Sequence, residues 1–206
     1  MPFITFEGVE GCGKSTQLRL LDERLRAESR DVRATREPGG TPLGERLRAL
    51  LLDAARAPLD PIAEWLLFEA DRRQHLAEVV RPALAAGAWV LCDRFSDSTE
   101  AYQSAGRGLD AAFIDAVDGR VRNGLAPDLT LLYDIDAAEG LARARRRDAR
   151  EDRFESEELA FHERVRRRFL EIARREPDRV VIVPAQADAA AVFAETSRIV
   201  TERFGP

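Results

Sequence analysis

The segment from Gly8 to Thr16 carries glycines, a lysine and hydroxyl groups at a spacing that can hold a chain of phosphates. It fits the pattern G-x-x-x-x-G-K-[ST], in which glycines let backbone N–H groups turn inward around phosphate oxygens. Lys14 can bridge the β- and γ-phosphates of ATP, and the Ser15 hydroxyl can bind Mg²⁺. We therefore predict a site for MgATP made of Gly8, Val9, Glu10, Gly11, Cys12, Gly13, Lys14, Ser15 and Thr16.

Lysine usage singles out the same position. The chain has 32 lysine and arginine residues, and Lys14 is the one lysine among them. Arginine therefore serves wherever any positive charge is sufficient. At position 14 the compact ammonium group of lysine, on its flexible stem, suits a phosphate better than the planar guanidinium group of arginine. A guanine-reading N-K-x-D segment, which a GTPase would need, is excluded for lack of a second lysine.

The segments around this loop have the periodicities that such a site needs. Residues 3–7 are predicted to form a short strand, and residues 14–28 a helix, because Leu18, Leu21 and Leu25 follow helical spacing. A loop between a strand and a helix places phosphates at the helix N-terminus, where the positive end of the helix dipole lies.

Further strands and helices alternate along the rest of the chain. Strands are predicted at 31–36, Ala88–Cys92, Leu129–Tyr133 and Val180–Val183, and helices at Leu43–Ala54 and, with Pro61 in the first turn, at Asp60–Ala86. Alternating strands and helices imply a parallel sheet. The predicted fold is α/β with three layers, a five-stranded parallel sheet flanked by helices, in a single domain of residues 1–206.

Composition narrows the class of protein. With 206 residues, 45% of them hydrophobic, the chain can bury a sizeable core, and its net charge of −5 argues against a nucleic-acid coat. It contains no apolar run long enough to span a bilayer, and its N-terminus does not read as a secretory signal. Cys12 and Cys92 lack C-x-x-C spacing. We therefore expect a reduced, cytoplasmic protein without nucleic-acid or membrane partners.

Charged residues at strand ends indicate a second anion site. Asp93 follows the strand Ala88–Cys92 and is a candidate for holding Mg²⁺ together with Ser15, although an aspartate there could also cap a helix. Arg36 and Arg94 end two strands, where open α/β sheets bind their ligands. A kinase needs such arginines to hold an acceptor anion in line with the γ-phosphate, whereas an ATPase does not. Taken alone, either arginine would more often be a surface charge.

Several longer motifs occur in one order. They are Gly8–Thr16, Thr35-Arg36-Glu37-Pro38-Gly39-Gly40-Thr41, Phe68-x-x-x-Arg72, Asp93-Arg94-Phe95, Ser98-Thr99-Glu100-Ala101-Tyr102-Gln103 and Gly106-Arg107-Gly108. This set resembles the thymidylate kinases, over residues 1 to at least 175. The phosphate loop is common to many families, but the T-R-E-P-G-G-T and D-R-F-x-x-S-T-x-A-Y-Q runs are specific. The resemblance implies transfer of the γ-phosphate of ATP to thymidine 5′-monophosphate (dTMP).

The resemblance also implies a binding site for the base. Phe68 would stack on the thymine ring, and Arg72 would hydrogen-bond its O4. Thr99 and Gln103 would contact the base edge, and Tyr102 would wall the deoxyribose. The i,i+4 offset places Phe68 and Arg72 on one helix face, which fits joint stacking and hydrogen bonding. An aromatic residue on an apolar helix is otherwise usually core.

The remaining implied contacts concern the phosphate and sugar of the acceptor. Arg36 and Arg94 would grip the 5′-phosphate, and Glu10 would meet the 3′-hydroxyl. Ser98 belongs to the same run and is counted with the acceptor site. The resemblance further implies a homodimer.

An arginine-rich segment at about 143–155 is predicted to act as a lid. Its arginines are Arg143, Arg145, Arg146, Arg147, Arg150 and Arg153. Arginines that close over a moving phosphoryl group stabilise its spreading charge. The phosphate loop has Glu10 and no arginine, which resembles the bacterial branch, where the lid delivers that arginine. We predict that Arg147 does so, helped by Arg143 or Arg145. The alternative is that this arginine-rich segment is an ordinary solvent-exposed helix face.

Three other functions stay open on the residues alone. A kinase of this kind could act on another nucleoside monophosphate or on a deoxynucleoside. An ATPase that drives partner binding would hydrolyse ATP without an acceptor. A non-catalytic nucleotide sensor fits less well, because Lys14, Ser15 and Arg94 are intact.

Overall fold

The sheet of this protein is parallel throughout, with the strand order β2-β3-β1-β4-β5. The computed structural model describes residues 1–53, 59–147 and 157–205. Its strands are β1 (Phe3–Glu7), β2 (Val32–Arg36), β3 (Trp89–Asp93), β4 (Leu129–Asp134) and β5 (Val180–Pro184). The five predicted strands are therefore present, each within a residue or two of its expected bounds. Parallel strands end at one edge, so the sequence motifs that follow β1, β2 and β3 meet there.

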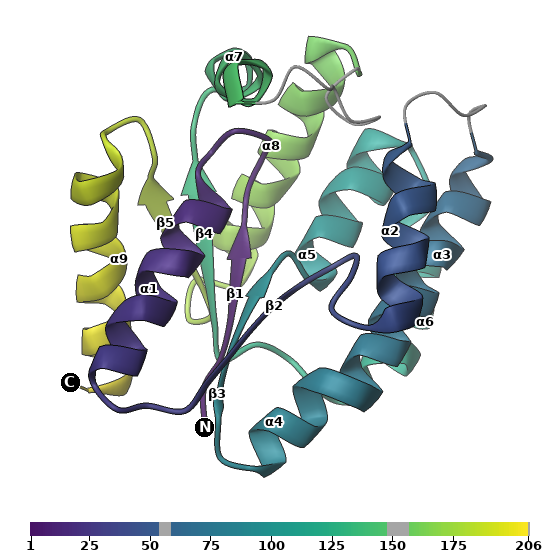
Figure 1. Cartoon of the computed structure of the whole chain (residues 1–206). Coiled ribbons are helices and arrows are strands. Elements are labelled where there is room, and N and C mark those ends of the chain that lie inside the picture. The colour runs from purple at the N-terminus through teal and green to yellow at the C-terminus, as the bar shows by residue number, and fades with distance from the viewer. Residues whose placement is uncertain (54–58, 148–156, 206) are drawn as a thin grey trace.

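Helices cover both faces of the sheet (Figure 1). One face carries α1 (Lys14–Ala27) and α9 (Ala189–Phe204), which pack on each other. The remaining helices lie on the other face, apart from α7, which lies above the carboxyl ends of the strands. These are α2 (Pro42–Leu52), α3 (Pro61–His75), α4 (Arg81–Ala85), α5 (Ser96–Thr99), α6 (Ala111–Arg122), α7 (Ala137–Arg147) and α8 (Leu159–Arg175).

The predicted helix Asp60–Ala86 is one helical run with a change of pitch. Asp60 caps it as predicted, because its side chain accepts hydrogen bonds from the N–H groups of Ile62 and Ala63. The run continues from α3 through a π-helical stretch, η1 (Leu76–Val80), into α4. A second π-helical stretch, η2 (Glu100–Gly106), continues α5. It includes Tyr102 and Gln103, so wider turns present part of the predicted acceptor site.

The core lies between the sheet and its helices. Strand side chains such as Ile4, Phe6 and Leu131 are fully buried, as expected for strands covered on both faces. Phe6 and Tyr133 stack across neighbouring strands with ring centroids 6.0 Å apart. This packing fixes the strand ends that carry the site. Among the helices of the described residues, none is both long and apolar enough to cross a membrane.

Candidate active site

The phosphate loop needs its glycines for backbone conformation. Gly8, Gly11 and Gly13 have φ angles of 138°, 68° and 95°, which L side chains rarely adopt. A Cβ on Gly8 would also lie 2.5 Å from the carbonyl oxygen of Tyr133. The loop leads directly into α1, which begins at Lys14. The strand, loop and helix thus have the order that the motif requires, and backbone N–H groups at the start of α1 face the loop.

Lys14 is held inside its own loop. Its Nζ donates to the carbonyl oxygens of Gly8 and Val9 at 2.9 and 2.8 Å, and contacts Cys12 Sγ at 3.4 Å. The side chain is buried, yet it lines the cavity described below. An ammonium group has three donors. Phosphate oxygens would therefore replace carbonyl oxygens as partners when Lys14 binds a nucleotide.

Ser15 and Asp93 meet at the end of the loop. Ser15 Oγ donates to Asp93 Oδ2 at 2.6 Å. Asp93 is the last residue of β3, and α5 begins at Ser96 with Phe95 as its N-cap, so Asp93 does not cap that helix. A hydroxyl and a carboxylate side by side are the oxygen donors that Mg²⁺ prefers. These two residues fit the predicted metal site.

A cavity of about 570 Å³ joins this loop to the residues predicted for the acceptor. Its walls come from the loop after β1, the end of β2, helix α3 and the segment after β3. Its lining includes thirteen of the predicted site residues, which are Glu10, Gly11, Lys14, Ser15, Arg36, Phe68, Arg72, Asp93, Arg94, Ser98, Thr99, Tyr102 and Gln103. One space thus brings the predicted donor site and acceptor site together.

Arg94 occupies a special position between loop and cavity. Its φ of 71° is left-handed, an uncommon conformation for a residue with a side chain. The guanidinium donates to Glu10 Oε1 at 2.9 Å and to Ser98 Oγ at 3.2 Å, and lies over the Tyr102 ring. The backbone turn aims this charge across the phosphate loop instead of into solvent.

Glu10 is the acidic counterpart of Arg94. The Tyr102 hydroxyl donates to its two oxygens at 2.7 and 2.8 Å, and His162 Nδ1 lies 3.2 Å from Oε2. Burial opposes the charge of Glu10, but Arg94, His162 and Lys14 together hold its pKa well below the ordinary range. Glu10 therefore offers an ionised, acceptor-only group to the cavity.

Arg72 is fixed by acids before any ligand arrives. Its Nε donates to Glu37, its Nη1 to Glu69 and Asp118, and its Nη2 to Thr99 Oγ1, all within 2.9 Å. Burial opposes its charge, yet the three carboxylates raise the pKa of Arg72 above the ordinary value. The guanidinium has five N–H donors. Four of them meet these partners, which leaves one Nη2 hydrogen without a partner in the described part of the chain.

Arg36 and Arg48 add positive charge at the far wall. Arg36 pairs with Glu45 at 2.8 Å, and both side chains are about half exposed. Arg48, on α2, lines the same cavity and donates to the carbonyl oxygen of Pro38. Burial and then the charges of Arg36 and Arg94 lower the pKa of Arg48. Positive charge gathered in this way favours the binding of an anion.

The comparisons with known proteins bear on this geometry. The sequence model of the family described as thymidylate kinase matches residues 6–196. A thymidylate kinase of Trichlorobacter lovleyi is 52% identical to this chain, and the match covers 98% of each chain. One of Caulobacter vibrioides is 53% identical, over 98% of this chain and 97% of that one. The chain belongs to the thymidylate kinase family. The activity of that family is therefore the function of this chain.

A solved structure supports the same assignment. The crystal structure of thymidylate kinase from Ehrlichia chaffeensis matches with a TM-score of 0.79 and 36% sequence identity, over 97% of this chain and 98% of that one. The predicted α/β fold with a five-stranded parallel sheet is thus confirmed.

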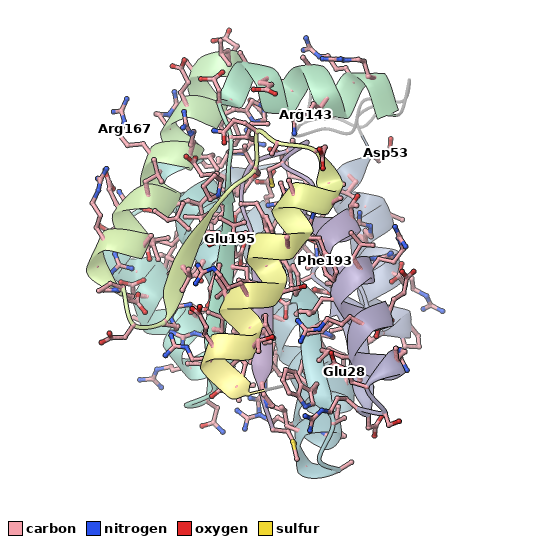
Figure 2. All side chains as sticks on the ribbon, turned by 90° about the vertical axis from the view of Figure 1, so that its left-hand side faces the viewer. Glu28, Asp53, Arg143, Arg167, Phe193 and Glu195 are labelled. Carbon is pink, nitrogen blue, oxygen red and sulfur yellow. The ribbon has the colours of Figure 1, made fainter. Side chains whose placement is uncertain are left out.

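The predicted lid lies only partly within the described residues of this thymidylate kinase family member. Arg143 donates to the carbonyl oxygens of Ala185 and Gln186 at 2.9 and 2.8 Å, so it joins α7 to the segment before α9 (Figure 2). Arg145 is exposed on the same helix. Neither residue lines the cavity. The side chain of Arg147 and the whole of residues 148–156 lie outside the described part of the chain.

Sequence reasoning missed several residues that shape the site. Arg48 gave no signal, because an arginine on a helix is usually a surface charge. Glu7 is buried at the end of β1 and accepts hydrogen bonds from the Phe95 backbone N–H and the Ser98 hydroxyl at 2.7 and 2.6 Å. Burial and the charge of Asp97 raise the pKa of Glu7 to about 8. An acid inside an apolar strand was the available signal.

Proposed function

We propose how the residues of this cavity divide the work of moving the γ-phosphate of MgATP to dTMP, which gives ADP and dTDP. The observation that carries the proposal is that one cavity is lined both by Lys14, Ser15 and Asp93 and by Arg36, Arg48 and Arg94. Two phosphate chains can therefore meet end to end. Positioning and charge neutralisation are the main needs of such a transfer.

At the donor end, the phosphate loop holds ATP. Backbone N–H groups of residues 8–16 bind the phosphate oxygens, and Lys14 leaves the carbonyl oxygens of Gly8 and Val9 to bridge the β- and γ-phosphates. Ser15 and Asp93, already in contact, would hold Mg²⁺. When bound, the ion offsets the charge of the phosphates.

At the acceptor end, three arginines hold the 5′-phosphate of dTMP. Arg36 exchanges Glu45 for the phosphate, and Arg48 and Arg94 approach from the other walls. The exposed Arg36–Glu45 pair is weak, so a doubly charged phosphate can displace it. Glu10, an ionised acceptor, receives the 3′-hydroxyl of the sugar, with Tyr102 against the deoxyribose.

The base end of the cavity reads thymine. Phe68 and Arg72 project from the same face of α3, where Phe68 supplies an aromatic surface and Arg72 has one uncommitted Nη2 hydrogen for O4. That hydrogen shares its nitrogen with the bond to Thr99. Thr99 and the buried Gln103 stand at the base edge. A rigid donor in a fixed direction suits a carbonyl oxygen and disfavours the amino group that cytosine carries there.

The transfer itself needs no protein nucleophile. An acceptor phosphate oxygen is already anionic and attacks the γ-phosphorus in line, so a general base is unnecessary. We propose that the chain belongs to the branch in which a lid at about 143–155 brings Arg147, aided by Arg143 or Arg145, to the transferred group. Glu10, in place of an arginine in the phosphate loop, supports that assignment.

An acceptor panel tests the proposal. ADP release from MgATP is measured with dTMP, dUMP, dCMP, dGMP or dAMP and without any acceptor. We expect dTMP to give the highest kcat/KM and ATP alone to give almost no ADP. A higher kcat/KM with another nucleotide would contradict the proposal that this cavity recognises thymine. Rapid ATP hydrolysis without an acceptor would indicate an ATPase and would contradict the proposed transfer to dTMP.

We also propose that residues 1–206 act as one kinase domain and assemble as a homodimer. Helices α2, α3 and α6 lie together on one side of the molecule and expose Leu43, Ile62, Leu66 and Phe113, each between 43% and 49% exposed. This apolar surface fits a second copy of the same chain. Cys12 and Cys92 are buried free thiols, which supports a reducing compartment such as the cytoplasm.

A further inference from the structure

His162 is a buried imidazole outside the cavity. It lies near the start of α8, is fully buried, and is absent from the cavity lining. Its Nδ1 lies 3.2 Å from Glu10 Oε2 without the alignment of a full hydrogen bond, and Nε2 has no hydrogen-bond partner among the described residues. A buried imidazole that is so poorly paired costs stability. An apolar side chain would pack there at lower cost, so a role besides packing is needed.

The surroundings keep the imidazole where it is. The Phe161 ring meets the His162 ring edge to face at 5.3 Å and also packs against Tyr102. Gly106 leaves room for this contact, because a Cβ there would lie 2.6 Å from the Phe161 ring. The start of α8 is thus seated against η2. His162 is presented to Glu10 by a rigid contact and not by a mobile loop.

The contacts of Glu10 are divided unevenly between its two oxygens. Oε1 receives Arg94 and Tyr102, whereas Oε2 receives Tyr102 and has His162 beside it. If Arg94 turns to the acceptor phosphate, as the proposed function requires, Oε1 loses its charged partner. Tyr102 and His162 then remain as the groups that fix the carboxylate plane.

We propose that His162 is a positioning residue that orients the Glu10 carboxylate toward the sugar of the acceptor, and so sets the preference for an acceptor with a 3′-hydroxyl. This inference rests on the proposed function, in which Glu10 receives that hydroxyl. An ionised carboxylate accepts hydrogen bonds only, and it repels phosphate, so among the sugar and phosphate groups of dTMP the 3′-hydroxyl is the one that it can bind. A carboxylate turned away from the hydroxyl loses that contact.

The test compares dTMP with 3′-deoxythymidine 5′-monophosphate, which lacks this hydroxyl. The measured quantity is the kcat/KM for dTMP divided by the kcat/KM for the deoxy analogue, with saturating MgATP. Glu10→Gln first establishes how much of the ratio the carboxylate supplies. We expect His162→Phe to lower the ratio about tenfold, with a rise in the KM of dTMP and little change for the deoxy analogue. His162→Asn, which keeps an N–H close to the Nδ1 position, is expected to retain most of the ratio.

Two controls separate positioning from general support of the fold. His162→Phe removes a poorly paired polar group, so its Tm is expected to equal or exceed that of the wild-type protein. Val165→Ala, on the same helix and also fully buried, is expected to lower the Tm and to affect both acceptors alike. His162→Leu gives the same comparison if His162→Phe does not fold.

The double variant Glu10→Gln/His162→Phe completes the cycle. We expect its ratio to match that of Glu10→Gln alone, because His162 acts through Glu10. Additive losses, or a wild-type ratio in both His162→Phe and His162→Leu, would overturn the role of His162 while leaving the proposed function intact. An unchanged ratio in Glu10→Gln would instead contradict the proposed contact between Glu10 and the 3′-hydroxyl. The role of His162 would then be contradicted too, because it depends on that contact.

Discussion

At the scale of single residues, Lys14 stabilises the phosphate loop itself and is also the residue expected to bind the phosphates of ATP. Its ammonium stabilises the carbonyl oxygens of Gly8 and Val9 before nucleotide arrives. Lys14→Ala is expected to lower kcat by at least about a hundredfold, because the charge on the γ-phosphate loses its donor. Steady-state kinetics with dTMP measures this loss, and near-normal turnover would contradict the mechanism. Lys14→Arg is the matched control and is also expected to be slow, since a planar fork replaces a compact cation.

A substitution of Arg48 tests the proposed binding of the acceptor phosphate. It lines the cavity, and the charges of Arg36 and Arg94 lower its pKa. We expect Arg48→Gln to raise the KM of dTMP about tenfold, because a hydrogen bond to a charged group is worth about 1.5 to 3 kcal/mol. The KM of ATP is expected to change little. A variant at the exposed Arg19, which pairs with Glu23 on the outer surface of α1, serves as control and is expected to leave both constants unchanged.

Asp71 gives a stability prediction with a defined pH dependence. It is fully buried, accepts a hydrogen bond from the Gly39 N–H at 3.0 Å, and has no partner for Oδ2 among the described residues. Burial and the Glu37 carboxylate raise the pKa of Asp71 to about 7. The folded protein therefore retains a proton that the unfolded chain releases near pH 3.8, so the stabilising contribution is complete in acid and is lost as pH rises to about 7.

Asp71→Asn removes this titration and keeps an oxygen for Gly39. Relative to wild type, the free energy of unfolding of the variant is expected to increase between about pH 4 and pH 7, by up to about 1.4 kcal/mol per pH unit, and to level off above pH 7. Urea unfolding at a series of pH values measures the difference. A difference that stays constant across this range would show that Asp71 ionises normally in the folded state.

At the scale of elements, α7 packs directly on the phosphate loop. A Cβ on Gly140 would lie 2.5 Å from the Glu10 carbonyl oxygen, and one on Gly11 would lie 1.9 Å from the Gly140 carbonyl oxygen. This backbone contact joins the arginine-bearing helix to the ATP site. Gly140→Ala is therefore expected to push α7 away, to raise the KM of ATP several-fold, and to lower stability by about 1 to 3 kcal/mol.

The chain offers a matched control for that substitution. Gly119 lies inside α6, and a Cβ there would meet no heavy atom within 4 Å. Gly119→Ala is expected to stabilise the protein by about 0.5 to 1 kcal/mol through helix propensity and to leave the KM of ATP unchanged. Thermal unfolding and ATP titrations on both variants test the pair. Equal effects from the two substitutions would mean that the α7 contact has no bearing on nucleotide binding.

The elements were predictable to the extent that local patterns determine them. Continuous apolar runs predicted β3, β4 and β5, and the cap formed by Asp60 predicted the start of α3. The π-helical stretches and the left-handed Arg94 could not be predicted, because they depend on contacts between distant segments. For the same reason the positions of Arg48 and His162 beside the site were missed. Each contacts the site from a helix whose own pattern is that of an ordinary amphipathic surface.

At the scale of the whole molecule, the apolar surface over α2, α3 and α6 is where we propose that two copies of the chain meet. Ile62 and Leu66 are one helical turn apart on α3, and Phe113 packs beside them through Trp65, with ring centroids 5.1 Å apart. Water covers this surface in a monomer, which makes a self-complementary dimer favourable. The same α3 carries Phe68 and Arg72, so dimer formation would also stabilise the helix that we propose reads the base.

Leu66→Glu places a charge on that surface, where Leu66 is 49% exposed. We expect it to convert the proposed dimer to a monomer in sedimentation velocity experiments at micromolar concentration, because burying two unpaired carboxylates costs several kcal/mol. The KM of dTMP is expected to rise as α3 loses its support. Ile182→Glu is the matched control, since Ile182 is 42% exposed on β5, away from this surface, and is expected to leave the dimer intact. Dimers that persist in Leu66→Glu, or that dissociate in Ile182→Glu, would place the contact between copies on another face.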